Sequence, residues 1–275
     1  MARETEADGL EHALISDGPV LLRQQGHIAV MTLNRPDSSN GLNTELLKAL
    51  LAAVMRCHGD PTIRVVLLRG AGKNFCAGGD IHEFSAQGER LGDFLKEVTA
   101  YLQMAVGAMI RLDAIVVAEV QGFAAGGGGL GLVCAADLVV AADTAVFMTG
   151  ATRVGMAPDG GSSVILPRLV GMRKAAELLY TNRPVPAAEA VEIGLINKAV
   201  PENELAAEAR SLAEQLAAGA PLALSGTKRL LWNGVGVEQH LPEEARTVST
   251  LSATSDSREG LDAVINRRQP VFSGK

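Results

Sequence analysis

Cysteine is scarce in this sequence of 275 residues, which contains only Cys57, Cys76 and Cys134. Three cysteines without a Cys-x-x-Cys pair exclude a disulfide framework and indicate a reducing compartment. The five histidines lack metal-ligand spacing, so we expect no metal site. Several charged residues among the first seventeen exclude the apolar stretch of a signal peptide. A cytoplasmic location is therefore predicted.

Basic charge and long hydrophobic runs are lacking as well. The 25 Lys and Arg residues against 31 Asp and Glu give a net charge of -6. This balance removes the electrostatic attraction that binding to nucleic acid or to an anionic membrane surface requires. The one long uncharged run, 120–136, is shorter than the roughly 20 apolar residues of a membrane span. We expect neither nucleic acid nor a membrane as a partner.

Aromatic residues make up only 3% of the chain, although 47% of it is hydrophobic and 30 residues are glycine. The hydrophobic content excludes disorder, and the length fits one large domain or two small ones. With so few aromatic rings, the core must consist mainly of Leu, Val and Ala with close backbone contacts.

Strand and helix patterns alternate along the first two thirds of the chain. Apolar, β-branched runs at 28–33 and 63–69 predict strands. Between them, helical spacing predicts a helix that starts near Thr44 with Asn43 as its N-cap. Further along we expect a helix at 93–110 and strands at 115–120, 138–141 and 145–148. This alternation favours an α/β architecture with buried strands.

The last part of the chain is helical throughout. Amphipathic spacing predicts helices at 187–193, 202–217 and 221–232. We therefore divide the chain into a flexible N-terminal segment at 1–17, a core at 18–200 and a C-terminal helical region at 201–275. The helical region either packs back on the core or against another subunit.

Two glycine-rich segments, 76–80 and 126–131, stand between predicted elements. The second contains a literal G-x-G-x-x-G, but a run of four glycines satisfies many patterns and lies five residues beyond the nearest predicted strand. A dinucleotide site is therefore the weaker interpretation. Glycines at strand ends let the backbone approach a ligand, and exposed N–H groups there stabilise negative charge. Two such segments predict an oxyanion hole, with close helix-to-strand packing as the alternative.

Several motifs in a fixed order resemble the enoyl-CoA hydratase/isomerase, or crotonase, superfamily. The motifs are Asn34-Arg35-Pro36, Asn40-Gly41-Leu42-Asn43, Phe75-Cys76-Ala77-Gly78-Gly79-Asp80-Ile81, Gly122-Phe123-Ala124-Ala125 with the glycine run, 154–161 with Leu166-Pro167-Arg168, and Arg258-Glu259-Gly260. The resemblance covers about residues 18 to 275. It implies a spiral of ββα turns, with a C-terminal helical region used in assembly, commonly as a homotrimer or a dimer of trimers.

The resemblance also implies an acyl-CoA thioester as the substrate, with no cofactor beyond the coenzyme A that the substrate carries. In the family two backbone N–H groups bind the thioester oxygen, and here they fall on Ala77 and on either Gly127 or Gly128. Counting from Gly122 favours Gly127, whereas counting back from Asp137 favours Gly128. Substrate contacts are expected from Arg35, Gly78, Gly79, Asp80, Ile81 and Ala151.

In a typical hydratase of the family, two glutamates together activate water and move a proton. This sequence departs from that pattern. The first glutamate position falls on Leu130 or Gly131 and the second on Ala151. What remains is Asp159, at the place where isomerising members carry a catalytic aspartate. We therefore predict an isomerase that shifts a 3-enoyl-CoA, or a ring-type analogue, to the 2-enoyl form. The plainer interpretation makes Asp159 a turn residue or an N-cap.

Other functions stay open at this point. A lone Asp159 that orients water would give an enoyl-CoA hydratase. A 4-chlorobenzoyl-CoA dehalogenase-like enzyme shares the aspartate, but its tryptophan partner falls on Ala151. A non-catalytic acyl-CoA binder is consistent with the missing glutamates. His82 and Glu83 follow the Ala77 loop, where they would line an acyl pocket, although a helix-start Glu favoured by the dipole is the plainer interpretation. Asp80 is likewise better explained as a loop or cap residue.

Overall fold

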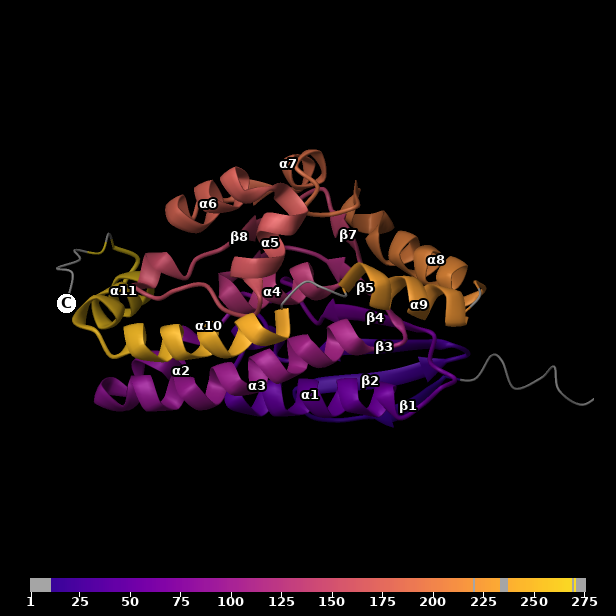
Figure 1. The fold of residues 1–275 in the computed structure, drawn as a ribbon, viewed down its shortest axis with the longest axis horizontal. Coiled ribbons are helices and arrows are strands. Elements are labelled where there is room, and N and C mark those ends of the chain that lie inside the picture. Colours follow the sequence, from indigo (N-terminus) through magenta and orange to yellow (C-terminus); the bar gives the residue numbers. More distant parts are fainter. Residues whose placement is uncertain (1–10, 220, 233–236, 269, 271–275) are drawn as a thin grey trace, which may run out of the picture.

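The computed structural model describes residues 11–219, 221–232, 237–268 and 270, and a seven-stranded sheet lies at its centre (Figure 1). The strand order is β1-β2-β3-β4-β5-β7-β10. Neighbours from β3 to β10 are parallel, whereas β1 and β2 add an antiparallel edge. The strands are β1 (His12–Ile15), β2 (Val20–Gln25), β3 (Ile28–Leu33), β4 (Val65–Gly70), β5 (Ile115–Val120), β7 (Leu138–Ala142) and β10 (Lys198–Val200).

A second layer of short pairings follows the carboxyl ends of these strands. Leu42 pairs with Gly79, and Cys76 with Ala124, as isolated parallel bridges. A three-stranded sheet in the order β6-β8-β9 continues the layer. Its strands are β6 (Phe123–Ala125), β8 (Val146–Met148) and β9 (Val185–Pro186). The chain thus repeats a long strand, a short extended segment and a helix, which is the ββα spiral that the resemblance implies.

Helices cover both faces of the large sheet. α1 (Thr44–His58) begins at the predicted cap, because the Asn43 side chain accepts a hydrogen bond from the Leu46 N–H at 2.9 Å. α1 packs on β2 and β3 and against α3 (Leu91–Arg111), whereas α8 (Leu205–Ala217) packs on β3, β4, β5 and β7. Figure 1 shows α8 on the side opposite to α1 and α3.

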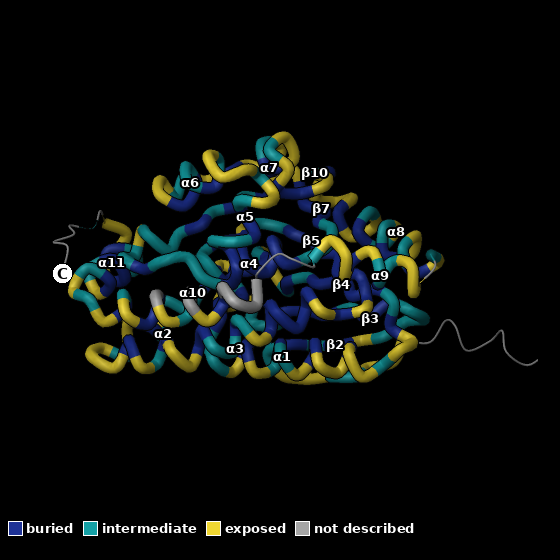
Figure 2. Tube along the Cα trace, in the orientation of Figure 1, coloured by how far each residue is buried: buried dark blue, intermediate teal, exposed yellow. Residues whose placement is uncertain are grey.

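The remaining elements complete the turns of the spiral. They are α2 (Ile81–Ser85), α4 (Gly126–Ala135), α5 (Ser162–Val170), α6 (Met172–Thr181) and α7 (Ala187–Glu192), with 3₁₀ helices at Pro36–Ser38, Gly88–Arg90, Thr152–Val154 and Glu202–Glu204. α4 lies at the centre of the molecule and is buried along most of its length (Figure 2). Because its first residues are glycines, neighbouring backbone can approach this helix closely.

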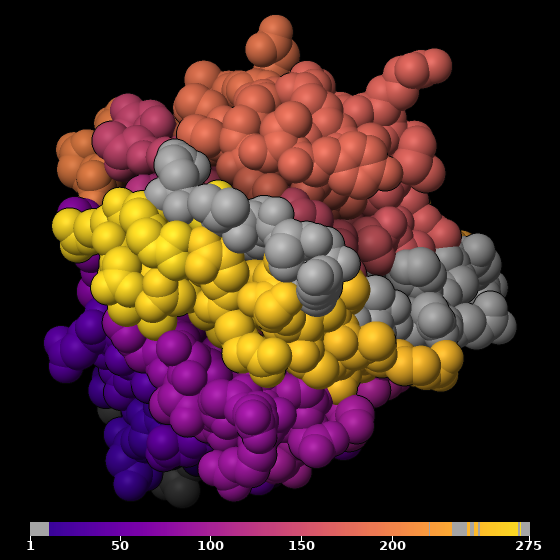
Figure 3. Space-filling model, turned by 90° about the vertical axis from the view of Figure 1, so that its left-hand side faces the viewer, coloured from indigo at the N-terminus to yellow at the C-terminus, as the bar shows by residue number. Residues whose placement is uncertain are grey.

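The C-terminal helices pack back on the core of the same chain. They are α9 (Pro221–Trp232), α10 (Val237–Ser252) and α11 (Ser255–Ile265). α10 packs along α3, and in Figure 3 the yellow C-terminal segment lies directly against the purple segment that includes α3. Lys228 of α9 is buried and pairs with Asp137 at 2.7 Å, which ties the region to the end of α4.

The structure differs from the sequence prediction mainly at the N-terminal end. β1 lies inside the segment 1–17 that is expected to be flexible, and residues 1–10 of that segment lie outside the described residues. β2 is also absent from the prediction, because its polar second half breaks the apolar run. Within the described residues, no helix is long and apolar enough to cross a membrane.

Candidate active site

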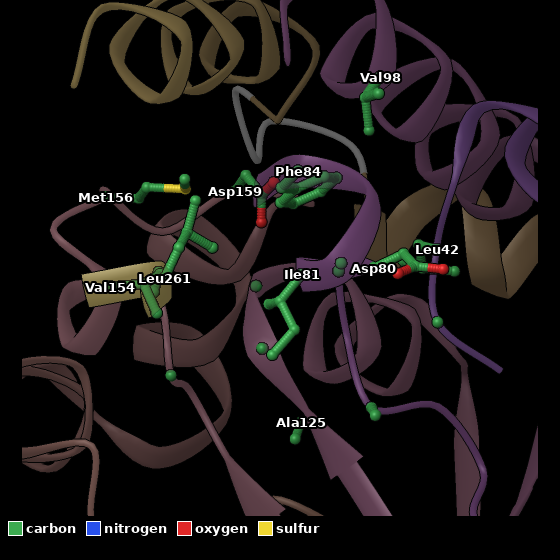
Figure 4. Close-up of a pocket in the computed structure, with 18 of the residues that line it drawn as sticks. Leu42, Asp80, Ile81, Phe84, Val98, Ala125, Val154, Met156, Asp159 and Leu261 are labelled. Atoms are coloured by element: carbon green, nitrogen blue, oxygen red, sulfur yellow. The ribbon is translucent and has the colours of Figure 1, made fainter. Parts of the chain in front are cut away.

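A cavity of about 620 Å³ lies where the glycine-rich turns meet the C-terminal helices (Figure 4). α3 supplies Leu95, Val98 and Leu102, and the C-terminal helices supply Val248, Leu261 and Val264. The turns supply a polar rim and several backbone segments. From these turns and their neighbours come Asp37, Ser38, Ser39, Leu42, Ala77, Gly79, Asp80, Ile81, His82, Phe84, Ala125, Gly126, Gly127, Gly128, Ala151, Arg153, Met156 and Asp159. The cavity therefore combines an aliphatic wall with exposed main chain.

The glycine run forms the first turn of α4. Ala125 is the N-cap, and its side chain offers no acceptor to the helix. Helix geometry leaves the N–H groups of 126–128 without acceptors inside the helix, because the first helical bond runs from the Gly129 N–H to the carbonyl oxygen of the N-cap. The helix dipole adds partial positive charge at this end. The predicted donors Gly127 and Gly128 are both in this turn, and both line the cavity.

The two glycines of this pair face different neighbours. A Cβ on Gly127 would overlap Asp159 Oδ1, whereas a Cβ on Gly128 would overlap the side chain of Leu42. Gly129 faces the backbone at Cys76, so it serves close packing. Close packing, the alternative interpretation of the glycine run, therefore applies to Gly129, whereas an oxyanion hole at Gly127 or Gly128 stays a prediction.

Asp159 lies directly beside this turn, in the segment that leads into α5. It is half-buried and lines the same cavity as Phe84 and Met156 (Figure 4). The N-cap of α5 is Gly161, and no side-chain bond caps that helix. Ser162 instead donates its Oγ–H and its N–H to the Asp159 carbonyl oxygen, at 2.6 and 3.0 Å. The backbone of Asp159 is thus fixed, and its carboxylate lies against the first turn of α4 in the cavity lining.

The other predicted donor, the Ala77 N–H, has a partner in this structure. It donates to the Ser39 carbonyl oxygen at 3.0 Å. Ser39 and Asn40 both have left-handed backbone, with φ of 50° and 54°. A thioester oxygen that binds at Ala77 must therefore compete with, or displace, a carbonyl of this turn.

Asn40 holds that turn in place and is a residue whose role sequence reasoning missed. It is fully buried, and its Nδ2 contacts the carbonyl oxygens of Ala71, Asn74 and Phe75 at 2.8 to 3.0 Å. Its Oδ1 accepts from the Arg35 N–H at 2.9 Å. The motif contained the residue, but only the fold shows that three carbonyl groups distant in sequence converge on it.

Arg35 and Asp80 form an ion pair with an N–O distance of 3.1 Å. Asp80 also caps α2, because its Oδ1 accepts from the Glu83 N–H at 3.2 Å. Asp80 lines the cavity, as Gly79 and Ile81 do, whereas Arg35 and Gly78 lie outside its lining. Arg35 therefore joins two loops of the site, and a contact between Arg35 and substrate stays a prediction.

The structure also shows where Gly78 lies, and where His82 and Glu83 lie at the start of α2. Gly78 has φ +91°, and a Cβ there would lie 2.7 Å from the Ala125 carbonyl oxygen, so it is a packing glycine. His82 is exposed at the cavity rim. Burial, and then the charge of Asp80, raise the pKa of Glu83, which is not part of the lining.

The structure also shows which residues stand at the positions where a hydratase carries its two glutamates. Ala151 lines the cavity and carries no polar group. Leu130 is 2% exposed and belongs to the hydrophobic core, away from the cavity lining. Gly131 faces Gly160, since a Cβ there would lie 2.6 Å from the Gly160 carbonyl oxygen.

Of the three aspartates in the lining, Asp37 is exposed and Asp80 is paired with Arg35, which leaves Asp159 at the glycine turn.

Side chains of metal-ligating type line this site, and a cysteine lies near it. In the described ranges no group of three or more His, Cys, Asp or Glu side chains is arranged to hold a metal ion. Cys76 lies under the glycine turns and is fully buried, and burial raises its pKa to about 12. Such a thiol stays protonated at neutral pH and is a poor nucleophile.

The two-layered spiral, with a cavity at its glycine-rich turns, defines a crotonase-type fold. The model of the family described as Enoyl-CoA hydratase/isomerase matches residues 23–275. The chain belongs to the enoyl-CoA hydratase/isomerase family and is an enzyme of the crotonase superfamily. The alternative of a dinucleotide site at the glycine run has no support from this family.

Relatives of the chain carry the names of both activities. A probable enoyl-CoA hydratase of Rhodobacter capsulatus is 36% identical over 250 residues, which cover 90% of this chain and 95% of the relative. The crystal structure of an enoyl-CoA hydratase from Mycobacterium avium subsp. paratuberculosis has a TM-score of 0.85 and 30% identity, covering 93% of this chain and 99% of that chain. A monofunctional enoyl-CoA isomerase from M. smegmatis has a TM-score of 0.67 and 33% identity, covering 79% and 93%.

Proposed function

We propose that this enzyme is an enoyl-CoA isomerase that shifts the double bond of a 3-enoyl-CoA, or of a ring-type analogue, to the 2-position. The observation that carries the proposal is the place of Asp159. Its carboxylate lies against the N-terminal turn of α4, inside an otherwise aliphatic part of the cavity. A base in this place is next to the groups that would hold the thioester oxygen.

The reaction needs one base and one site for negative charge. Asp159 would remove a proton from C2, and the electron pair would move into the thioester to give an enolate oxygen. The same proton would return to C4 as the double bond moves to C2–C3, so that one carboxyl group serves as base and acid. No water, metal or cofactor enters this balance.

Backbone N–H groups would stabilise the enolate oxygen. Gly127 and Gly128 offer donors at the positive end of α4, and Ala77 offers a third donor once the Ser39 carbonyl oxygen gives way. Each aimed donor typically contributes about 3 kcal/mol to the barrier reduction. The Ser39 contact predicts that the 36–40 turn shifts when an acyl-CoA binds.

Enoyl-CoA hydratase is the second candidate, because many relatives are named as hydratases. Hydration in the two-glutamate manner needs carboxylates that orient a water molecule on one face of the substrate. Here Ala151 supplies a methyl group, and Gly131 faces backbone. These residues favour the isomerase.

The surroundings also support proposals on the acyl group and on assembly. Leucine, valine and methionine side chains around Asp159 fit a hydrocarbon acyl group better than one with a second carboxylate.

We also propose the homotrimer or dimer of trimers that the resemblance implies. Large apolar side chains on α6 and α9 are solvent-exposed in the single chain, namely Met172, Tyr180, Leu222, Leu230 and Leu231.

The test is mass spectrometry of a 3-enoyl-CoA incubated in deuterated water with the wild-type enzyme and with Asp159→Asn. A moved double bond in an unchanged skeleton, lost in the variant, supports the isomerase. Addition of water by both proteins contradicts it and favours the hydratase. Binding without reaction favours a non-catalytic binder or another acyl group, and release of chloride from 4-chlorobenzoyl-CoA would favour a dehalogenase.

A further inference from the structure

One face of α4 carries glycine at two positions a single helical turn apart, Gly127 and Gly131. Residues four apart on a helix point to the same side. A Cβ on Gly127 would overlap Asp159 Oδ1, and a Cβ on Gly131 would lie 2.6 Å from the Gly160 carbonyl oxygen. The turn that carries the proposed base therefore rests in a groove made by the missing side chains of α4.

The contact at Gly131 leaves no free space. The Gly160 Cα and carbonyl carbon would both lie 3.1 Å from the added Cβ, so the whole residue is in the way and not only its oxygen. Gly160 has φ +59°, and a Cβ on Gly160 would itself lie 3.2 Å from the Gly127 carbonyl oxygen. Backbone thus meets backbone on both sides of this contact.

Asp159 is the residue next to Gly160 in the chain, and it cannot stay in place if Gly160 moves. Its carbonyl oxygen accepts two hydrogen bonds from Ser162, so the backbone of Asp159 and the start of α5 move together. A methyl group on Gly131 would push this unit away from α4. The carboxylate of Asp159 would then leave the turn that offers the N–H donors.

We infer that Gly131 is a positioning residue, which places the Asp159 carboxylate by having no side chain. This inference rests on the proposed function, in which Asp159 is the base. It also explains why this site has one carboxylate where a typical hydratase has two glutamates. The volume that a glutamate at 131 would need for its first carbon atoms is filled by Gly160. Of the two positions left open in the sequence, Gly131 is the one that faces Gly160, the neighbour of Asp159.

The test compares two glycine-to-alanine changes in buried helices. Gly131→Ala is the test variant, and Gly92→Ala is the matched control, because a Cβ at Gly92 meets Ser249 O at 3.2 Å and Ala253 Cβ at 3.3 Å, outside the cavity lining. A shift of about 1 Å in a catalytic group costs on the order of 100-fold. We expect Gly131→Ala to lower kcat for isomerisation about 100-fold with KM nearly unchanged, and Gly92→Ala to leave both constants close to wild type.

A double variant separates positioning from general damage. In the Asp159→Asn background, Gly131→Ala is expected to leave the residual rate of C2 proton exchange unchanged, because the group that it displaces is already disabled. Equal losses in both backgrounds would overturn the inference. So would full activity of Gly131→Ala, or a circular dichroism spectrum that shows it unfolded, since the glycine would then serve folding. An active Asp159→Asn variant would instead refute the proposed function itself.

Discussion

The Asp159 carboxylate and the Cα of Gly127 are so close that no Cβ fits between them. A carboxylate and a helix N-terminus are thus in contact, although 32 positions separate them in the chain (159 − 127). The proton to be moved in an enoyl thioester is on the carbon next to the carbonyl group. The proposed base beside the proposed oxyanion donors therefore matches the geometry of that substrate.

Gly127→Ala is the most direct change at this contact. Its methyl group would overlap Asp159 Oδ1, so the carboxylate must turn away. We expect kcat to fall about 100-fold, while the free energy of unfolding changes little, because alanine is favoured over glycine in a helix by about 1 kcal/mol. Steady-state kinetics and urea unfolding of the same preparation check this. Wild-type kcat in the variant would show that the carboxylate need not touch α4.

The pair of Arg35 and Asp80 gives a second prediction, on substrate affinity. Asp80→Ala removes the ion pair and the cap of α2, and losing an N-cap costs about 1 kcal/mol. We expect a total loss of stability of about 2 kcal/mol and a raised KM, because loops of the cavity rim loosen. Glu97→Ala, which breaks the exposed pair of Glu97 with Lys48, is the control and is expected to change stability by less than about 0.5 kcal/mol. An equal loss in both variants would refute the special role of the Arg35 pair.

Asn40→Gly separates the backbone of the 36–40 turn from its side-chain hydrogen bonds. Glycine accepts the left-handed φ of 54° without strain, so only the bonds of the amide are lost. Leaving buried carbonyl groups unsatisfied costs about 1–3 kcal/mol. We expect the free energy of unfolding to fall by about 2–3 kcal/mol, as measured by urea titration. A loss below about 0.5 kcal/mol would mean that water replaces the amide.

Glu119 lies on β5 beside Arg69 of β4, and its burial predicts that the stability of the fold depends on pH. Burial raises the pKa of Glu119 above its usual 4.5, and the charge of Arg69 only partly opposes this. Between the unfolded and the folded pKa the native state therefore binds more protons than the unfolded chain. Stability consequently falls as pH rises through that window.

The variant Glu119→Gln removes this titration. We expect it to gain stability relative to wild type as pH is raised from about 4.5 to 8, with the difference approaching a constant value above the folded pKa. Urea unfolding at several pH values measures the difference. A difference that is the same at pH 4.5 and at pH 8 would show that Glu119 titrates normally in the native state.

The parts of the fold that follow hydrophobic periodicity were predictable. The strands around Val30, Leu67 and Val117, and the helix capped by Asn43, are buried runs with clear boundaries. β1 was not, because its four residues are exposed or half-buried and pair only with β2 at the edge. Short elements at an edge leave little pattern in the sequence.

The sequence predicted which residues gather at the candidate site, but not the directions in which they point. The motifs placed Ala77, the glycine run and Asp159 in one site, and the structure brings all three to one cavity. Counting along the chain could not tell which way each glycine points, since this depends on where α4 starts. Nor could it show that Ser39 occupies the Ala77 N–H, because that contact needs two successive left-handed residues in a turn.

The C-terminal helices have a consequence for the order in which the enzyme is made. Val248 and Leu261 close the cavity, and both follow the last strand of the large sheet along the chain. The large sheet is complete once Val200 has paired with β7, so a nascent chain on the ribosome can finish its sheet while its cavity still lacks a wall. α10 and α11 can dock only after they too have been made. Synthesis therefore completes the large sheet before it completes the cavity.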